Sequence, residues 1–230
     1  MTFINGWSYE VDIPQKVDLI ICETIGSLGF EEGILAWLAD ARQRFLASGG
    51  RVIPQTLEVL LVPVEYPEYS DYSDLWKDTF YSLDLSPFKE LITNSLLGAK
   101  FDQKHLLADP ITFYHADLRD SQRTGFWGEG SFPISRAGTL YGLGGWFNAQ
   151  LAPGIFLTNS PPSETRNWYQ VFFPVSDPIG LSPGDLVTVN LGVSDDAHRW
   201  RWEVSIQDRK GVQIARMVND TFAGTLSQPV

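Results

Sequence analysis

The 230-residue chain lacks the features that define several protein classes. It has one cysteine, Cys22, which excludes an internal disulfide framework and is typical of a reducing compartment, so we expect a cytoplasmic location. No apolar run approaches the roughly 18 residues of a transmembrane helix, and no basic segment followed by an apolar core opens the chain. We therefore expect neither a membrane span nor a signal peptide. Three histidines lie scattered without metal-ligand spacing, so no metal site is predicted: His105, His115 and His198.

Basic residues are also in short supply. The chain has 17 Lys and Arg against 28 Asp and Glu, a formal net charge of −11. Because phosphate binding requires a basic face, we expect no nucleic-acid partner. The field of an acidic protein favours a cationic substrate, although acidic charge also serves solubility alone. The hydrophobic fraction of 43% and the eight tryptophans are typical of a globular protein.

The stretch around Glu23 organises the sequence. Val17–Cys22 is apolar apart from one aspartate, which predicts a strand buried on both faces of a parallel sheet. The strand ends at Glu23, and a glycine-containing loop leads to a second acidic pair, Glu31 and Glu32. Open α/β sheets bind ligands at the carboxyl ends of their strands, so we expect these acidic residues to be central to function.

The flanking segments complete an α/β pattern. Residues 2–13 alternate polar and apolar positions and predict a short strand. Past Gly33 the apolar residues recur at helical spacing, and the tandem Gly49 and Gly50 should end the helix. Residues 1–54 are therefore predicted to form strand, strand, helix and strand.

The remainder of the chain has a β-rich texture. An acidic, tyrosine-rich stretch, Glu65–Asp78, predicts a loop or weak helix, and Ser86–Leu91 a short helix. Poor order is expected from Met217 onward. Short β-type runs divided by turn residues predict a β-sandwich or barrel: Leu57–Val62, Lys100–Phe101, Ile111–His115, Phe132–Ile134, Thr139–Phe147, Trp168–Val175, Asp185–Val193 and Arg199–Ile206.

Glu23 and the pair Glu31 and Glu32 admit three interpretations. Two carboxylates that converge across a loop would accept bidentate hydrogen bonds from a guanidinium group. The same pair could act as the acid and base of a glycoside hydrolase. Alternatively, Glu31 and Glu32 occupy the first turn of a helix, where the macrodipole stabilises acidic side chains.

Two other patterns favour structural roles. Tyr141–Trp146 is rich in glycine but lies in β-type sequence without a following helix, so it predicts a bulge or close strand approach rather than a dinucleotide loop. Four tryptophans could form a stacking platform for sugars or bases, but core packing is the favoured interpretation for a β domain: Trp146, Trp168, Trp200 and Trp202.

The acidic loop resembles the double-glutamate loop of protein arginine methyltransferases. In that family one glutamate ends a strand, a glycine follows three residues later and a second glutamate lies nine residues after the first, matching Glu23, Gly26 and Glu32. Ser135–Phe147 resembles an early strand of the family's barrel, and Arg166–Gln170 lies where the family often has Thr-His-Trp.

The resemblance implies roles for individual residues. Glu23 and Glu32 would be the catalytic pair that holds the substrate guanidinium, while Glu31, Asn167 and Trp168 would contact the substrate. The implied cofactor is S-adenosylmethionine and the implied substrate an arginine-containing protein. The clamp would act by orientation and electrostatics.

The resemblance also implies an architecture. We expect an α+β chain with a partial Rossmann-like α/β segment over 1–54 and a β-barrel or sandwich domain over 55–220. A dimerisation arm is expected at about 66–91, which implies a homodimer, and a tail over 221–230.

The sequence departs from the family pattern in ways that matter. Thr24 and Ile25 replace a common Trp-Met pair, and Asn167 replaces the histidine. The family's cofactor-binding half has no counterpart in these 230 residues, so we expect a second chain or upstream residues to supply it. The alternatives are a non-catalytic scaffold or dimerisation module derived from the family and, less favoured, a carbohydrate-active β protein.

Overall fold

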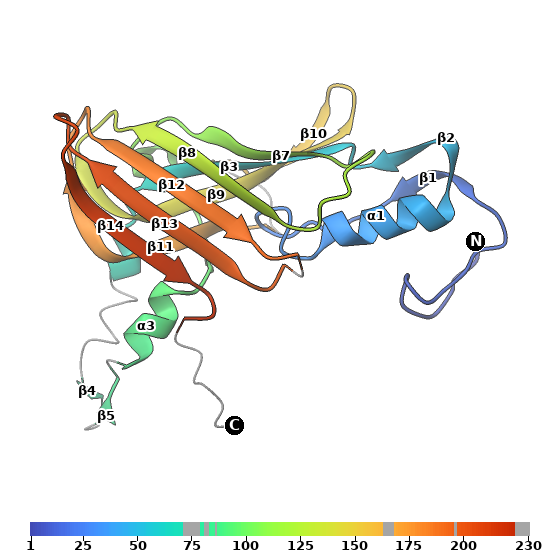
Figure 1. Cartoon of the computed structure of the whole chain (residues 1–230), viewed down its shortest axis with the longest axis horizontal. Coiled ribbons are helices and arrows are strands. Elements are labelled where there is room, and N and C mark those ends of the chain that lie inside the picture. Colours follow the sequence, from blue (N-terminus) through green and yellow to red (C-terminus); the bar gives the residue numbers. More distant parts are fainter. Residues whose placement is uncertain (71–78, 81–82, 86, 163–167, 196, 224–230) are drawn as a thin grey trace.

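The computed structural model describes residues 1–70, 79–80, 83–85, 87–162, 168–195 and 197–223. Figure 1 shows two layers of β-sheet, with a helix and two strands from the N-terminal part at one end of the long axis. A second, short helix projects from the sheets beside the smallest strand pair.

The N-terminal unit is a strand, a helix and a parallel strand. β1 (Val17–Ile21) pairs with β2 (Leu46–Ile53), and α1 (Ile34–Phe45) connects them. Helix α1 buries three apolar residues, Ile34, Leu35 and Leu38. The predicted strand, helix and strand are thus confirmed in type and order.

Three details of this unit differ from expectation. β1 is not buried on both faces: Leu19 is 43% and Ile21 70% exposed, because β2 is its only partner among the described strands. The helix does not reach the tandem glycines, since the chain turns extended at Leu46 and Gly49 lies within β2. Residues 2–13 form turns rather than a strand.

The N-terminal segment instead packs its aromatic residues on α1. Trp7 and Tyr9 lie against Trp37, with ring centroids 6.2 and 4.5 Å apart. Arg44 donates hydrogen bonds to the carbonyls of Ser8, at 2.8 Å, and Val11. Side-chain contacts with the helix therefore take the place of the strand pairing that alternation suggested.

Two antiparallel sheets form the β domain. The larger sheet has the order β6-β11-β9-β3-β7, with β10 paired to β9, and the smaller has the order β14-β13-β12-β8. The strands of the larger sheet are β3 (Thr56–Val64), β6 (Leu97–Ala99), β7 (Ile111–Asp117), β9 (Gly138–Ala152), β10 (Ile155–Thr158) and β11 (Gln170–Leu181). Those of the smaller sheet are β8 (Phe126–Pro133), β12 (Leu186–Val193), β13 (Trp200–Gln207) and β14 (Gln213–Asp220).

The sheets pack face to face around an aromatic core. Its largest fully buried members are Trp202, Phe132, Phe147, Phe172 and Phe173. The indole of Trp202 donates to the Pro174 carbonyl at 2.8 Å, which joins β13 to β11. Strand β7 approaches β8, and β11 approaches β14, but neither pair shares a hydrogen-bonded ladder in the described residues, so the sheets do not close into a barrel.

The glycine-rich stretch and the tryptophans behave as structural elements. Tyr141–Trp146 lies within β9, and a Cβ atom on Gly142 would lie 2.2 Å from the Phe173 carbonyl oxygen, so the close-approach prediction is confirmed. Trp146 and Trp200 are each 3% exposed, which confirms the core-packing interpretation for them as for Trp202.

Strand β14 corrects the expectation of poor order from Met217. Met217 pairs with Val204 of β13, and the ladder continues to Asp220. The strand forms because β13 offers a free edge, which the sequence of the tail alone does not reveal. Residues 224–230 lie outside the described residues.

The expected arm region contains β4 (Thr79–Phe80), β5 (Leu83–Asp84) and α3 (Pro87–Thr93). These elements project from the two sheets in Figure 1. The short helix predicted near Ser86–Leu91 is confirmed by α3. A one-turn 3₁₀ helix, η1 (Gln103–His105), follows β6.

Candidate functional site

The loop between β1 and α1 is fastened to the β domain by its apolar residues. Ile25, Leu28 and Phe30 are at most 3% exposed. Leu28 occupies space that only a glycine at position 145 leaves free, since a Cβ there would lie 2.6 Å from the Leu28 side chain. The ring of Phe30 contacts Phe126, with centroids 5.5 Å apart. Every second or third loop residue is thus anchored, which fixes the path of the residues between them.

Polar side chains of the β domain hold the backbone of the same loop. The Trp168 indole donates to the Ile25 carbonyl at 2.8 Å. Asn159, which is fully buried, donates to the carbonyls of Ser27 and Tyr169, both at 2.7 Å, and accepts from the Phe147 amide at 2.9 Å. One amide therefore satisfies three backbone groups from distant parts of the chain.

A second buried amide supports the first. Gln170, 2% exposed, donates to the Asn159 carbonyl at 2.6 Å and accepts from the Phe101 amide at 2.9 Å. Neither Asn159 nor Gln170 was a candidate from the sequence. A polar amide at the start of an apolar strand was the available signal for Gln170.

The acidic residues face different surroundings. Glu23 and Glu32 are exposed, and Glu31 is partly buried. No hydrogen bond or ion pair joins the three carboxylates within the described part of the chain. Glu32 lines a pocket of about 530 Å³ together with Cys22 and Thr24, the two neighbours of Glu23. Both ends of the loop thus border one cavity, although Glu23 itself is not among its lining residues.

Glu31 turns back into its own loop. Its Oε1 accepts a hydrogen bond from the Leu28 amide at 2.7 Å, and its carboxyl group lies against Gly26, where a Cβ would come within 2.3 Å. Its Oε2 is buried without a hydrogen-bond partner among the described residues. Burial raises the pKa of the Glu31 carboxyl, while backbone hydrogen bonds, led by that of Leu28, act in the opposite direction and the charge of Glu32 raises it slightly further.

The macrodipole interpretation placed Glu31 and Glu32 in the first turn of a helix, and that placement is wrong. Helix α1 begins at Ile34, after Gly33 in a left-handed conformation with φ 77°, and its first turn contains no acidic residue. Glu31 and Glu32 belong to the preceding turn. The Glu32 carbonyl accepts from the Trp37 indole at 3.0 Å, so α1 positions the backbone of Glu32 through a side chain rather than through its dipole.

Helix α1 is also tied to the β domain. Arg42 donates hydrogen bonds to the carbonyls of Leu118 and Ser121, in the connection from β7 to β8. Burial lowers the pKa of the Arg42 guanidinium, and Asp120 and Asp117 oppose that shift. The helix, the acidic loop and the β domain are therefore mutually braced.

Three further expectations concern Asn167, a metal site and a membrane span. Asn167 lies outside the described residues. Across the described ranges, no group of His, Cys, Asp and Glu side chains is arranged to hold a metal ion. Among those same residues, no helix has the length and apolar character needed to cross a membrane.

The β domain resembles a family of known proteins. The family model described as the arginine methyltransferase oligomerization subdomain matches residues 55–207. A probable histone-arginine methyltransferase CARM1 of Oryza sativa subsp. indica is 30% identical over 208 residues, covering 83% of this chain and 39% of the relative. Human protein arginine N-methyltransferase 2 is 27% identical over 212 residues, covering 86% and 48%. The chain thus spans less than half the length of these relatives.

Solved structures share the fold. A chain of the Trypanosoma brucei PRMT1 enzyme-prozyme heterotetrameric complex with AdoHcy superposes with a TM-score of 0.84 at 19% identity, covering 95% of this chain and 72% of that one. Arabidopsis thaliana protein arginine methyltransferase 10, in an open conformation, gives 0.76 at 21% identity, covering 95% and 74%. Because the family model matches most of its length, this chain belongs to the protein arginine methyltransferase family, of which it contains the oligomerization subdomain.

Proposed function

We propose that this chain supplies the guanidinium clamp and the oligomerization domain of an S-adenosylmethionine-dependent protein arginine methyltransferase. The observation that carries the proposal is the loop anchored by Trp168 and Asn159, which keeps Glu23 and Glu32 exposed at its two ends. In this proposal residues 1–54 form a partial Rossmann-like segment and 55–220 the β domain, followed by the 221–230 tail.

The chemistry follows from the properties of a guanidinium group. Its planar fork of donors matches carboxylate oxygens, so Glu23 and Glu32 would hold it by charge-assisted hydrogen bonds. S-adenosylmethionine, when bound, supplies the methyl group. The carboxylates would fix the direction in which one nitrogen faces that methyl group. They would also stabilise the positive charge that the guanidinium gains with the methyl group, until the nitrogen releases its proton. Glu31, Asn167 and Trp168 would complete the substrate surroundings, with Trp168 acting through the Ile25 carbonyl.

The cofactor would be held by residues other than these 230. We propose that a complementing chain, or a longer form of the protein, covers β1, where Leu19 and Ile21 are exposed on a strand with one described partner. The Trypanosoma brucei relative was solved as an enzyme-prozyme heterotetramer, which offers a precedent for two unlike chains. A cytoplasmic homodimer built through the 66–91 arm is the second assembly we consider.

The test is methyl transfer to an arginine-containing peptide by the complex isolated through a tag on this chain. Glu23→Gln and Glu32→Gln should each lower kcat by about 10²- to 10³-fold, as when one preorganised charged contact is lost. Glu129→Gln, an exposed position on β8, is the matched control and should keep the parent rate. Activity that survives both loop substitutions would remove the clamp assignment.

A non-catalytic scaffold derived from the family is the alternative function. The exposed apolar side chains of Leu83, in β5, and Leu91, in α3, favour an assembly role. A scaffold predicts that the Glu23→Gln, Glu32→Gln double variant leaves the methylation rate of the isolated complex unchanged. Removal of this chain from that complex would then abolish assembly instead.

A further inference from the structure

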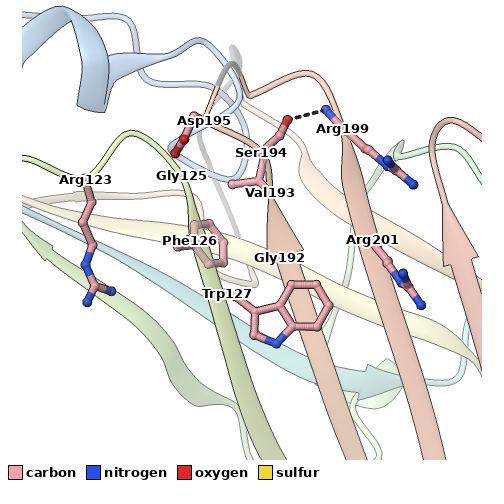
Figure 2. A pocket seen from close by; sticks show the side chains of 10 residues that line it. All are labelled: Arg123, Gly125, Phe126, Trp127, Gly192, Val193, Ser194, Asp195, Arg199 and Arg201. Carbon is pink, nitrogen blue, oxygen red and sulfur yellow. Dashed lines mark hydrogen bonds between the residues drawn. The ribbon is translucent and has the colours of Figure 1, made fainter.

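A hollow on the outer face of the smaller sheet combines arginine side chains with an exposed tryptophan. It has a volume of about 700 Å³ and is formed by the start of β8, the end of β12 and the start of β13. Figure 2 shows Trp127 between Arg123 and Arg201, with Arg199 and Asp195 nearer the loop that joins β12 to β13. Neither the clamp nor the arm uses these residues.

The strand register explains how the tryptophan is seated. Gly192 of β12 lies opposite Trp127 on one side and opposite Arg201 on the other, so all three share one face of the sheet. A Cβ atom on Gly192 would lie 2.0 Å from the Trp127 ring, which means that the indole lies over the glycine. Trp127 is nevertheless 57% exposed, so its indole offers a large apolar surface to a ligand.

Two of the three arginines keep their hydrogen-bonding capacity. Arg199 is paired with Asp220, at 2.6 Å, and Glu203 is paired with Arg216, at 2.8 Å. Within the described residues, the guanidinium groups of Arg123 and Arg201 donate no hydrogen bond and form no ion pair. The one acid lining the hollow, Asp195, accepts a hydrogen bond from the Thr124 hydroxyl at 2.8 Å. An anion would therefore find two guanidinium groups with open donors on either side of an indole. Arg201 lies two strands, or about 10 Å at the backbone, from Trp127, and Arg123 lies on the other side of the ring.

We propose that this hollow binds a short acidic segment of a partner protein. Carboxylates would pair with Arg123 and Arg201, and an apolar or aromatic side chain between them would stack on Trp127. Three arginines and one aspartate line the hollow on a chain with net charge −11, so it gives an acidic partner a complementary surface. A long polyanion would extend past the arginines onto Glu129 and Glu203, which disfavours nucleic acid relative to a short segment.

The test is fluorescence polarisation with the full chain and a short labelled peptide that carries aspartates on both sides of one tyrosine. Arg123→Glu and Arg201→Glu should each weaken binding about tenfold or more, and raised salt should weaken it further. The control is Arg209→Glu, which makes the same change in net charge at an exposed position beyond the other end of β13. It should change the affinity less than about twofold.

Two substitutions that leave the net charge unchanged test the contribution of the indole independently of the arginines. Gly192→Ala should displace the Trp127 ring from its position over the glycine and weaken peptide binding several-fold. Trp127→Ala removes the ring and should weaken binding to a similar extent. Both positions face the outer surface, and circular dichroism will confirm that the variants fold.

Any one of the following outcomes overturns the proposal. The first is no binding up to about 1 mM peptide, the limit of weak recognition. The second is equal loss in Arg209→Glu, or equal binding of a peptide with lysines in place of the aspartates. The third is tighter, Arg201-dependent binding of a single-stranded oligonucleotide, which would make the hollow a nucleic-acid site instead.

Discussion

At the scale of single residues, the acidic loop divides its carboxylates between structure and surface. Glu31 closes the loop on the Leu28 amide, while Glu23 and Glu32 remain exposed. Asn159 performs the matching task from the β domain by binding the Ser27 carbonyl. Glu31 and Asn159 both bond to the backbone of the loop, and each yields a measurable expectation.

Glu31→Gln should remove a pH dependence of stability. Because the folded-state pKa of Glu31 is raised above the unfolded value, its contribution is fully present below the unfolded pKa and is lost as pH rises through the folded pKa. Glutamine keeps an acceptor for the Leu28 amide and carries no charge. We expect the variant to gain stability over the parent as pH rises from 4 to 7 in urea unfolding. Glu129→Gln, which makes the same change in charge at an exposed residue of β8, is the control, and a pH-independent difference for Glu31→Gln would contradict the expectation.

Asn159→Ala should destabilise the chain and loosen the loop. The substitution leaves the Ser27 and Tyr169 carbonyls and the Phe147 amide without their partner, and each buried unsatisfied group costs about 1–3 kcal/mol. Denaturant unfolding gives the stability, and proteolysis within the loop reports its opening. Asn148→Ala, which removes a partly exposed hydrogen bond to Glu58, is the control. An equal cost for the two alanine variants would count against the anchoring role of Asn159.

At the scale of elements, β9 is the strand on which the larger sheet depends. It pairs with β3 and with β11, and its glycines let side chains and carbonyls of neighbouring elements approach closely. Gly145 admits Leu28 from the acidic loop, so the same strand that builds the sheet also seats the candidate site. Glycine here serves packing rather than an unusual backbone conformation.

Comparing Gly142→Ala with Gly180→Ala tests whether the close approach of neighbouring atoms, rather than the loss of a glycine, determines the cost in stability. A Cβ on Gly142 would lie 2.2 Å from the Phe173 carbonyl oxygen, whereas one on Gly180 would meet nothing within 4 Å. We expect Gly142→Ala to cost about 1–3 kcal/mol of unfolding free energy, the range for overpacking. Gly180→Ala should stay within about 0.5 kcal/mol of the parent. Similar midpoints for both variants in chemical denaturation would refute the close-approach argument.

At the scale of the whole molecule, the proposed assembly rests on apolar side chains that β5 and α3 leave exposed. Leu83 of β5 is 65% exposed, and Phe88 and Leu91 of α3 are 47% and 42% exposed. These elements project from the sheets in Figure 1. The family match to an oligomerization subdomain includes these residues, and the arm that we propose assigns this surface a role in assembly.

A Phe88→Glu, Leu91→Glu double variant should weaken the assembly formed through this surface. Burying a charge at an apolar interface is costly, so we expect light scattering after size exclusion to shift from the oligomer to the monomer mass. Phe156→Glu, which replaces an exposed residue of β10, is the control and should leave the mass of the oligomer unchanged. An unchanged oligomer in the double variant would show that the chains associate through another surface.

The sequence by itself determined most of the local elements and the family. Helical spacing predicted α1, and short β-type runs predicted strands in both sheets, although not β6, β10 or β14. The nine-residue interval from Glu23 to Glu32 indicated the methyltransferase resemblance. These signals are local because periodicity and motif spacing are set by neighbouring residues along the chain.

Tertiary structure alone decided which side chains hold the acidic loop and which side chains line the hollow on the smaller sheet. Asn159 reaches Ser27 across 132 residues of sequence, and Trp168 reaches Ile25 across 143, so no local pattern announces either contact. The arginine and tryptophan hollow likewise exists only because β8, β12 and β13 align Trp127, Gly192 and Arg201 in one row. Local patterns specify which elements form, but long-range packing and register specify which side chains meet.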